Sequence, residues 1–151
     1  MSYYNYPTLI NKLSYFDDQY VQLDISPLYT FKSDVNDNCK IDFGKILPLS
    51  SKSTPETRFR CWGSMCNSFY EENSDTDFNH DNDNNDDKYS SIIFCSKGMM
   101  PPIAILKGLS SMLPKNNTLI IEWKCPEYSR EGFLEITDGN IVYSKSIDCR
   151  N

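Results

Sequence analysis

Residues 89–124 have the sequence YSSIIFCSKGMMPPIAILKGLSSMLPKNNTLIIEWK, and this stretch decides the expected fold. It begins with an apolar run of strand length at 89–95 and ends with a second one at 118–124. Between them, two prolines open a segment, 103–113, with the apolar spacing of an amphipathic helix, and proline is tolerated in a first helical turn. The apolar residues that share one helical face are Ile103, Leu106, Leu109 and Leu113. The stretch therefore predicts a strand, a helix and a strand.

A hairpin is predicted immediately downstream. Gly132–Thr137 and Asn140–Ser144 are strand-like runs, and Asp138-Gly139 lies between them. Asp-Gly between two such runs is the strongest short hairpin signal, because both residues tolerate the positive φ that the tight turn needs.

Upstream lies an acidic insert, 71–87, which contains eight acidic residues and no Lys or Arg. The whole chain has 21 acidic and 15 basic residues, so 21 − 8 leaves 13 acids against 15 bases, or +2, for the remainder. The insert is rich in Asn and Asp and has one apolar side chain, Phe78. Such a segment cannot bury enough apolar surface to offset its ordering entropy, which predicts a disordered loop.

The residues before the insert predict a strand that pairs with the strand after it. Residues 58–70 are rich in aromatic side chains and are expected to be extended, with Gly63 at a bulge or a close backbone approach. Two strands joined by a polar loop are most simply antiparallel. Nearer the N-terminus, Tyr20–Ile25 alternates like a strand. A short helix is expected before it, from the spacing of Leu9, Ile10, Leu13 and Phe16 after Pro7.

Together these elements predict one α+β domain over residues 1–151, a ferredoxin-like sandwich with a mostly antiparallel sheet, about two helices and the acidic loop. The N-terminus lacks the basic flank and apolar run of a secretory signal, and no window has the apolar length of a membrane span. We therefore expect an intracellular, cytoplasmic protein that does not bind membranes.

Five short motifs in one order carry a family resemblance: Phe43–Pro48 (FGKILP), Cys61–Ser64 (CWGS), Met99–Pro102 (MMPP), Gly132-Phe133 and Asp138–Asn140 (DGN). Over roughly residues 43–145 the chain resembles the YubB-type ferredoxin-like domain, an uncharacterised family of plasmids and phages. The resemblance implies a ferredoxin-like fold and a mobile-element or viral origin, and it implies no activity. The family's second Trp after the Trp-Gly pair is absent here, and Met replaces the aromatic residue before the two prolines.

Cofactors, metals and disulfides are not expected. The six cysteines, Cys39, Cys61, Cys66, Cys95, Cys125 and Cys149, have irregular spacing, which indicates free and mostly buried thiols in a reducing compartment. Only Cys61 and Cys66 approach the spacing of zinc ligands. Acidic residues at 75–86 partly match a calcium loop, but His80 replaces the turn glycine, so weak binding of divalent ions is the expectation.

The sequence contains no catalytic motif, so we do not expect an enzyme. His80, the only histidine, lies in the insert, where it cannot hold the fixed geometry of a catalytic base. A hydrolase with an unrecognised carboxylate pair remains an alternative. The carboxylates available to it are Glu122, Glu127, Glu131 and Glu135.

The leading hypothesis is a non-catalytic accessory or interaction module with a protein partner. Its expected surface comprises Trp62, Gly63, Met99, Met100, Pro101, Pro102 and Trp123. Core packing of both tryptophans competes with that expectation and is favoured, since aromatic residues on sheets are more often buried. The nucleic-acid alternatives are single-strand binding through Trp62 and Tyr70, or an acidic DNA mimic. The near-neutral body argues against a nucleic-acid partner.

Overall fold

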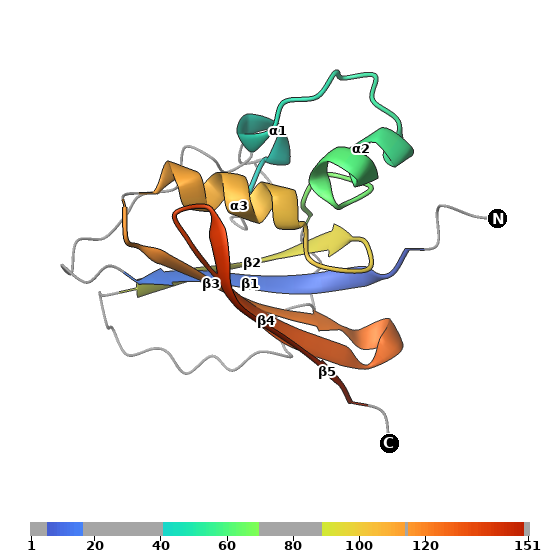
Figure 1. The fold of residues 1–151 in the computed structure, drawn as a ribbon. Coiled ribbons are helices and arrows are strands. Elements are labelled where there is room, and N and C mark those ends of the chain that lie inside the picture. Colours follow the sequence, from blue (N-terminus) through green and yellow to red (C-terminus); the bar gives the residue numbers. More distant parts are fainter. Residues whose placement is uncertain (1–5, 17–40, 70–88, 114, 150–151) are drawn as a thin grey trace.

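A computed structural model describes residues 6–16, 41–69, 89–113 and 115–149 (Figure 1). In chain order its elements are β1 (Thr8–Phe16), α1 (Phe43–Ile46), α2 (Pro55–Trp62), β2 (Tyr89–Lys97), α3 (Ile103–Met112), β3 (Thr118–Cys125), the 3₁₀ turn η4 (Pro126–Tyr128), β4 (Arg130–Thr137) and β5 (Asn140–Asp148). The acidic insert, His80 and Tyr20–Ile25 lie outside the described residues.

The sheet has five strands in the order β2-β1-β3-β4-β5, and every neighbouring pair is antiparallel. The three α-helices lie on one face of this sheet (Figure 1). The predicted α+β class with an antiparallel sheet is confirmed. The ferredoxin-like topology is not confirmed: the described chain order is β-α-α-β-α-β-β-β, whereas a ferredoxin-like unit is β-α-β-β-α-β.

The predicted N-terminal helix is wrong, because Thr8–Phe16 forms the strand β1 between β2 and β3. Leu9 and Leu13 are both buried on the helix side of the sheet, whereas Ile10 is buried on the other side with Cys95. Residues four apart share a face in a helix and also in a strand, where side chains alternate with period two. The spacing of the leucines therefore could not distinguish the two, and burial on both sides removed the polar alternation that marks most strands.

The predicted strand over 58–70 is also wrong. Residues Pro55–Trp62 form α2, whose N-cap Thr54 accepts a hydrogen bond from the Thr57 N–H at 3.1 Å. Proline suits the first helical position, and Gly63 ends the helix in the left-handed region at φ 86°. The glycine is thus a helix stop rather than a bulge. Of the expected strand pair, a single antiparallel bridge between Phe69 and Cys95 is present.

The other predicted elements are confirmed as β2, α3, β3 and the β4–β5 hairpin. At the hairpin turn Asp138 has φ 52° and Gly139 has φ 80°, as a two-residue turn of this kind requires. In α3, Leu106 and Leu109 are buried and Lys107 is exposed, so the predicted apolar face is the one that packs on the sheet.

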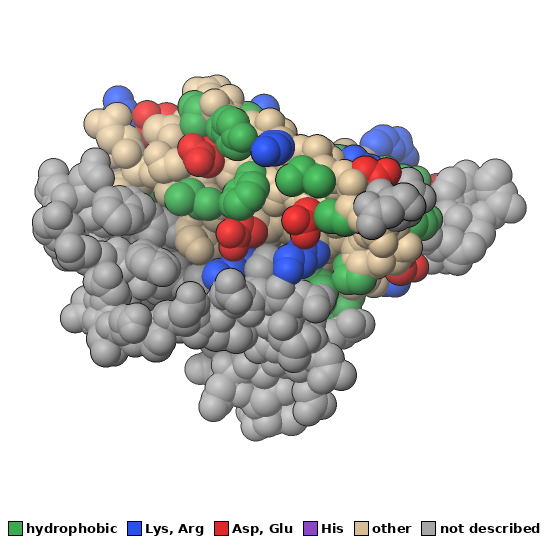
Figure 2. All heavy atoms as spheres, turned by 90° about the horizontal axis from the view of Figure 1, so that it is seen from below, with side chains coloured by type: hydrophobic (Ala, Val, Ile, Leu, Met, Phe, Trp, Pro, Cys, Tyr) green, Lys and Arg blue, Asp and Glu red, His purple; other side chains and the backbone are tan. Residues whose placement is uncertain are grey.

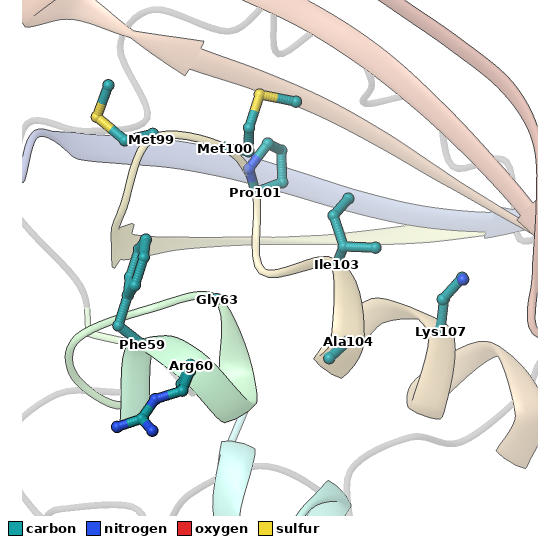
Figure 3. A pocket seen from close by; sticks show the side chains of 9 residues that line it. All are labelled: Phe59, Arg60, Gly63, Met99, Met100, Pro101, Ile103, Ala104 and Lys107. Carbon is teal, nitrogen blue, oxygen red and sulfur yellow. The ribbon is translucent and has the colours of Figure 1, made fainter. Parts of the chain in front are cut away.

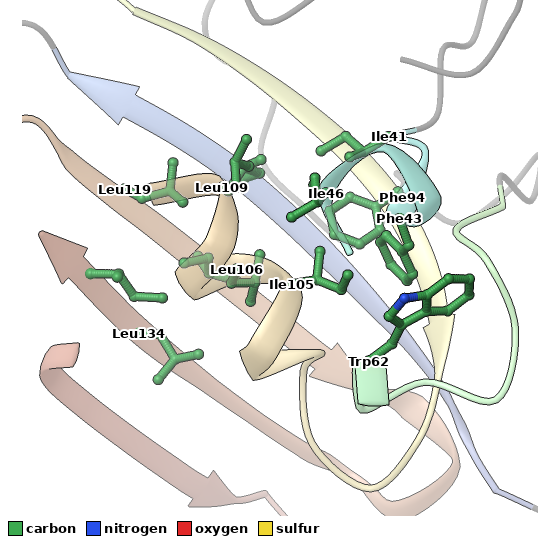
Figure 4. Close-up of a cluster of buried hydrophobic side chains, with 13 residues drawn as sticks. Ile41, Phe43, Ile46, Trp62, Phe94, Ile105, Leu106, Leu109, Leu119 and Leu134 are labelled. Atoms are coloured by element: carbon green, nitrogen blue, oxygen red, sulfur yellow. The ribbon is translucent and has the colours of Figure 1, made fainter. Parts of the chain in front are cut away.

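The main core fills the space between the helices and the sheet, with 13 buried residues drawn in Figure 4. Within it, Phe43 of α1 contacts Trp62 edge-on at 5.6 Å and Phe94 edge-on at 6.0 Å between ring centroids. These contacts join both short helices to the sheet. None of the helices in the described ranges has the length and apolar character needed to cross a membrane.

Candidate functional site

An apolar groove of about 430 Å³ lies between α2 and the loop that leads into α3 (Figure 3). Its apolar lining comes from Phe59, Met99, Met100, Pro101, Ile103 and Ala104. Arg60 from α2 and Lys107 from α3 complete it with two exposed cationic side chains, and Gly63 contributes backbone. The groove therefore combines a hydrophobic surface with positive charge, and none of the described residues that line it is acidic.

Two glycines bring the two sides of the groove together. A Cβ atom on Gly63 would lie 3.1 Å from the Pro102 Cα, and one on Gly98 would lie 2.6 Å from the Gly63 oxygen. The Gly98 distance is shorter than a real Cβ allows, and Gly63 has φ 86°, which other residues rarely adopt, so glycine suits both positions. The Met65 N–H also donates to the Lys97 oxygen at 2.9 Å, which ties the end of β2 to the residues after α2.

A second, smaller hollow of about 280 Å³ adjoins the groove. Phe59 and Arg60 line both hollows, and the Tyr6 ring stacks on Phe59 at 4.5 Å between centroids. On this side Glu56 adds one negative charge and Met65 adds a buried apolar floor. Phe59 therefore stands between two hollows that together form one extended surface.

The structure brings together four residues of the predicted interaction surface: Gly63, Met99, Met100 and Pro101 all line the groove. Trp62 and Trp123 are instead 5% and 2% exposed, and Pro102 is buried, so these three belong to the packed interior. The Trp62 Nε1 donates to the Leu47 oxygen at 2.8 Å, which satisfies its polar atom inside the core.

Phe59, Arg60, Ile103, Ala104 and Lys107 also line the groove and were not predicted. The sequence predicts an extended strand over 58–70, and this prediction hides the position of Phe59 and Arg60 on one helix. The helix-start signal Thr54-Pro55 together with Gly63 would have placed them on a helix. Once α2 is a helix, its exposed Arg60 and half-buried Phe59 are natural members of a surface facing α3.

The described cysteines provide thiols of differing exposure and no disulfide. Cys61 and Cys149 are exposed, Cys66 is half-buried, and Cys95 and Cys125 are buried. Burial raises the pKa of the Cys66 thiol, against the opposing effect of its hydrogen bond with Ser64, and burial likewise raises the pKa of Cys125. Within the described residues, no three His, Cys, Asp or Glu side chains lie close enough to hold a metal ion. Cys61 and Cys66 therefore lack the additional ligands that a zinc site would need among these residues.

The four carboxylates proposed for a hydrolase do not form a site in a cleft. Glu127 lies on η4 and accepts a hydrogen bond from the Thr8 N–H at 2.9 Å, which is a structural contact. Glu122 lies 3.8 Å from the Lys12 ammonium. The strand register puts Glu122, Glu131 and Glu135 on the sheet face that points away from the helices.

The sheet face that points away from the helices carries described side chains of both charges (Figure 2). Lys12, Lys124 and Lys145 share it with the three glutamates, as the register shows. Trp62 is buried on the opposite, helix side and cannot stack on a base, and Tyr70 lies outside the described residues. The described residues of this face form no continuous basic surface for a strand of phosphates.

No family model, curated protein or solved structure matches this chain.

Proposed function

We propose that this chain is a non-catalytic protein-interaction module, and that the groove between α2 and α3 binds a short segment of a protein partner. One observation carries the proposal: Met99 and Met100 are 45% and 40% exposed and stand side by side over a hollow lined by further apolar residues. Exposed methionines are typical of binding surfaces because the unbranched, polarizable side chain adapts to its partner. A concave apolar surface of this kind is a candidate for contact.

The charges at the groove define the chemistry of that partner. Arg60 and Lys107 are exposed on its two sides, and its lining within the described part of the chain contains no carboxylate. A segment with one large apolar side chain between acidic residues complements both features. The volume of about 430 Å³ lies within the ordinary range for a site that takes one bulky group.

Rigid support beneath the groove favours binding without a large ordering cost. Trp62, at the end of α2, is held by Phe43 and by its hydrogen bond to Leu47. Arg58 fixes the same helix through its Nε, which donates to the Met65 oxygen at 2.8 Å. A surface that is already formed loses less conformational entropy when a partner binds.

The family resemblance is compatible with this function and stays a proposal, together with the ferredoxin-like fold that it implies. Two of its motifs, Cys61–Ser64 and Met99–Pro102, meet at the groove through Gly63 and the Met99–Pro101 loop. No comparable observation among the described residues supports the nucleic-acid alternative or the hydrolase alternative.

Selection of displayed random peptides on the folded chain tests the proposal. We expect enriched peptides with a large apolar residue flanked by Asp or Glu, and we expect them to shift the backbone NMR signals of α2 and residues 99–107. Met100→Lys should weaken their binding at least about tenfold, because it removes apolar surface and buries a charge against the apolar residue of the peptide. Arg60→Glu should weaken the binding of the acidic peptides more than Met100→Lys does.

Met112→Lys is the matched control, since Met112 is 50% exposed on α3 but does not line the groove. This variant should bind the same peptides with unchanged affinity. The proposal is wrong if selection yields no acidic-apolar peptides, or if Met100→Lys and Met112→Lys have equal effects.

A further inference from the structure

The outer edge of β5 is the exposed edge of the sheet. All nine residues of β5 are exposed, and no described strand pairs with its outer side (Figure 1). Four of its side chains are large and apolar: Ile141, Val142, Tyr143 and Ile147. The opposite edge differs, because the Met65 and Phe69 backbones hydrogen-bond to the outer side of β2.

An edge strand of this length with apolar side chains is a template for pairing with another strand. Proline and dense charge are the usual protections, and β5 has no proline and a single lysine, Lys145. The register with β4 shifts at Glu135/Ile136, where Val142 is the extra residue of a bulge. Beyond that bulge the pairing with β4 is regular from Tyr143 to Ile147, so alternate backbone N–H and C=O groups of this run point to the outer side.

We infer that β5 pairs antiparallel with β5 of a second copy of this chain, about a two-fold axis at Ser144. In this register Tyr143 lies opposite Lys145 of the second copy, and the reverse contact follows by symmetry. Val142 lies opposite Ser146 of the second copy. A register centred one residue later would place Lys145 directly opposite Lys145 of the second copy. Like charges in directly opposite positions are unfavourable.

The neighbouring strand strengthens this choice of register. Phe133 of β4 pairs with Lys145 across the sheet and is 38% exposed on the same face. The Lys145 ammonium would then lie between Phe133 and Tyr143 of the second copy, where both rings offer cation–π contact. Glu135 pairs with Tyr143 on its other side, so a carboxylate follows Tyr143 in the same cross-strand row. This self-complementarity favours a second copy over an unrelated strand, and it is independent of the groove.

Sedimentation velocity of the full chain over a range of concentrations tests the inference. The wild-type chain should sediment as a dimer. Tyr143→Lys should raise the dimer dissociation constant at least about tenfold, because it places two lysine pairs in contact across the axis. Tyr128→Lys is the matched control: Tyr128 is 42% exposed, lies on η4 outside the Val142–Ser146 region of the proposed pairing, and should leave the dimer intact.

The double variant Tyr143→Lys/Lys145→Glu tests the register, since it should restore opposite charges across the axis and return the dimer. Circular dichroism of each variant verifies that the sheet is retained, which the half-exposed position of Tyr143 predicts. A wild-type chain that stays monomeric at every concentration overturns the inference. So does a Tyr143→Lys variant that dissociates no more than Tyr128→Lys, and a double variant that stays monomeric overturns the Ser144-centred register.

Discussion

Trp62 connects two parts of the helical layer through its side chain. Its ring packs edge-on against Phe43, and its Nε1 donates to the Leu47 oxygen at 2.8 Å. The same side chain thus holds α2 and the segment after α1 together over the sheet. A position with both apolar and polar partners tolerates few replacements.

Trp62→Phe should lower the free energy of unfolding by about 1 to 3 kcal/mol, because the Leu47 oxygen loses its donor and the smaller ring leaves space. Chemical denaturation measures the change. Tyr128→Phe, at an exposed aromatic position, should stay within roughly 0.5 kcal/mol. Equal stabilities for the two variants would contradict the role given to the indole.

The thiols should react in an order set by burial. Alkylation of the folded chain is expected to modify the exposed Cys61 and Cys149 first, Cys66 more slowly, and Cys95 and Cys125 last. The raised pKa values of Cys66 and Cys125 reduce the thiolate, which is the reactive form. Peptide mass spectrometry after timed labelling gives the rates, and Cys66 reacting as fast as Cys149 would contradict the order.

The same shifts give the sign of a pH effect on stability. A thiol whose pKa is higher in the folded state holds its proton more tightly there than in the unfolded chain. Its contribution is present below the unfolded pKa and is lost as the pH rises through the folded pKa. Cys66→Ser should therefore reduce the loss of stability between neutral and alkaline pH, as denaturation at both pH values would show.

At the scale of elements, α3 joins the core to the groove. Its buried face contributes Ile105, Leu106 and Leu109 to the core, and its exposed side contributes Ala104 and Lys107 to the groove. This division follows the 3.6-residue period of a helix, which separates neighbours in sequence onto different faces. A change on one face should leave the other largely unaffected.

Leu106→Ala and Leu109→Ala should each cost about 2 to 5 kcal/mol of unfolding free energy, as large-to-small changes at buried positions do. Both side chains are at most 1% exposed. Lys107→Ala should stay within roughly 0.5 kcal/mol. Chemical denaturation compares the three variants. A mild effect of Leu109→Ala would contradict the helix, because residues three apart share a helical face and lie on opposite faces of a strand.

At the scale of the molecule, charge is unevenly distributed along the chain. Segment 71–87 holds eight of the 21 acidic residues and no Lys or Arg. Because the remainder of the chain carries +2, the net charge of −6 comes from this segment. Stability and colloidal solubility should respond separately to changes in the segment.

Replacing Asn73–Asp87 with a short Gly/Ser linker should preserve cooperative unfolding, because loop length affects stability only weakly. The replacement removes six acids and no bases, so the net charge changes from −6 to −6 + 6 = 0. We expect lower solubility at neutral pH, since proteins near zero net charge associate. Thermal melting and precipitation assays measure the two effects. A lost cooperative transition would show that the segment is structural.

The sequence by itself determined the elements whose signals are local. The Asp138-Gly139 turn, the prolines before α3 and the apolar runs of β2 and β3 each depend on a few neighbouring residues, and all were predicted. Of the groove, it identified Gly63, Met99, Met100 and Pro101. Thr54-Pro55 and Gly63 also held a local signal for α2, which the aromatic content of the segment obscured.

Tertiary structure alone decided the rest. Leu9 and Leu13 have a spacing that suits a helix or a strand, and β1 is a strand because β2 and β3 flank it with open hydrogen-bonding edges. Trp62 is buried because Phe43, distant in sequence, packs against its ring and in turn contacts Phe94 of the sheet. Phe59 and Lys107 share a groove only after α2 and α3 pack side by side. Each outcome depends on contacts between residues that are distant in sequence. The free energy of such contacts cannot be predicted from a local sequence pattern.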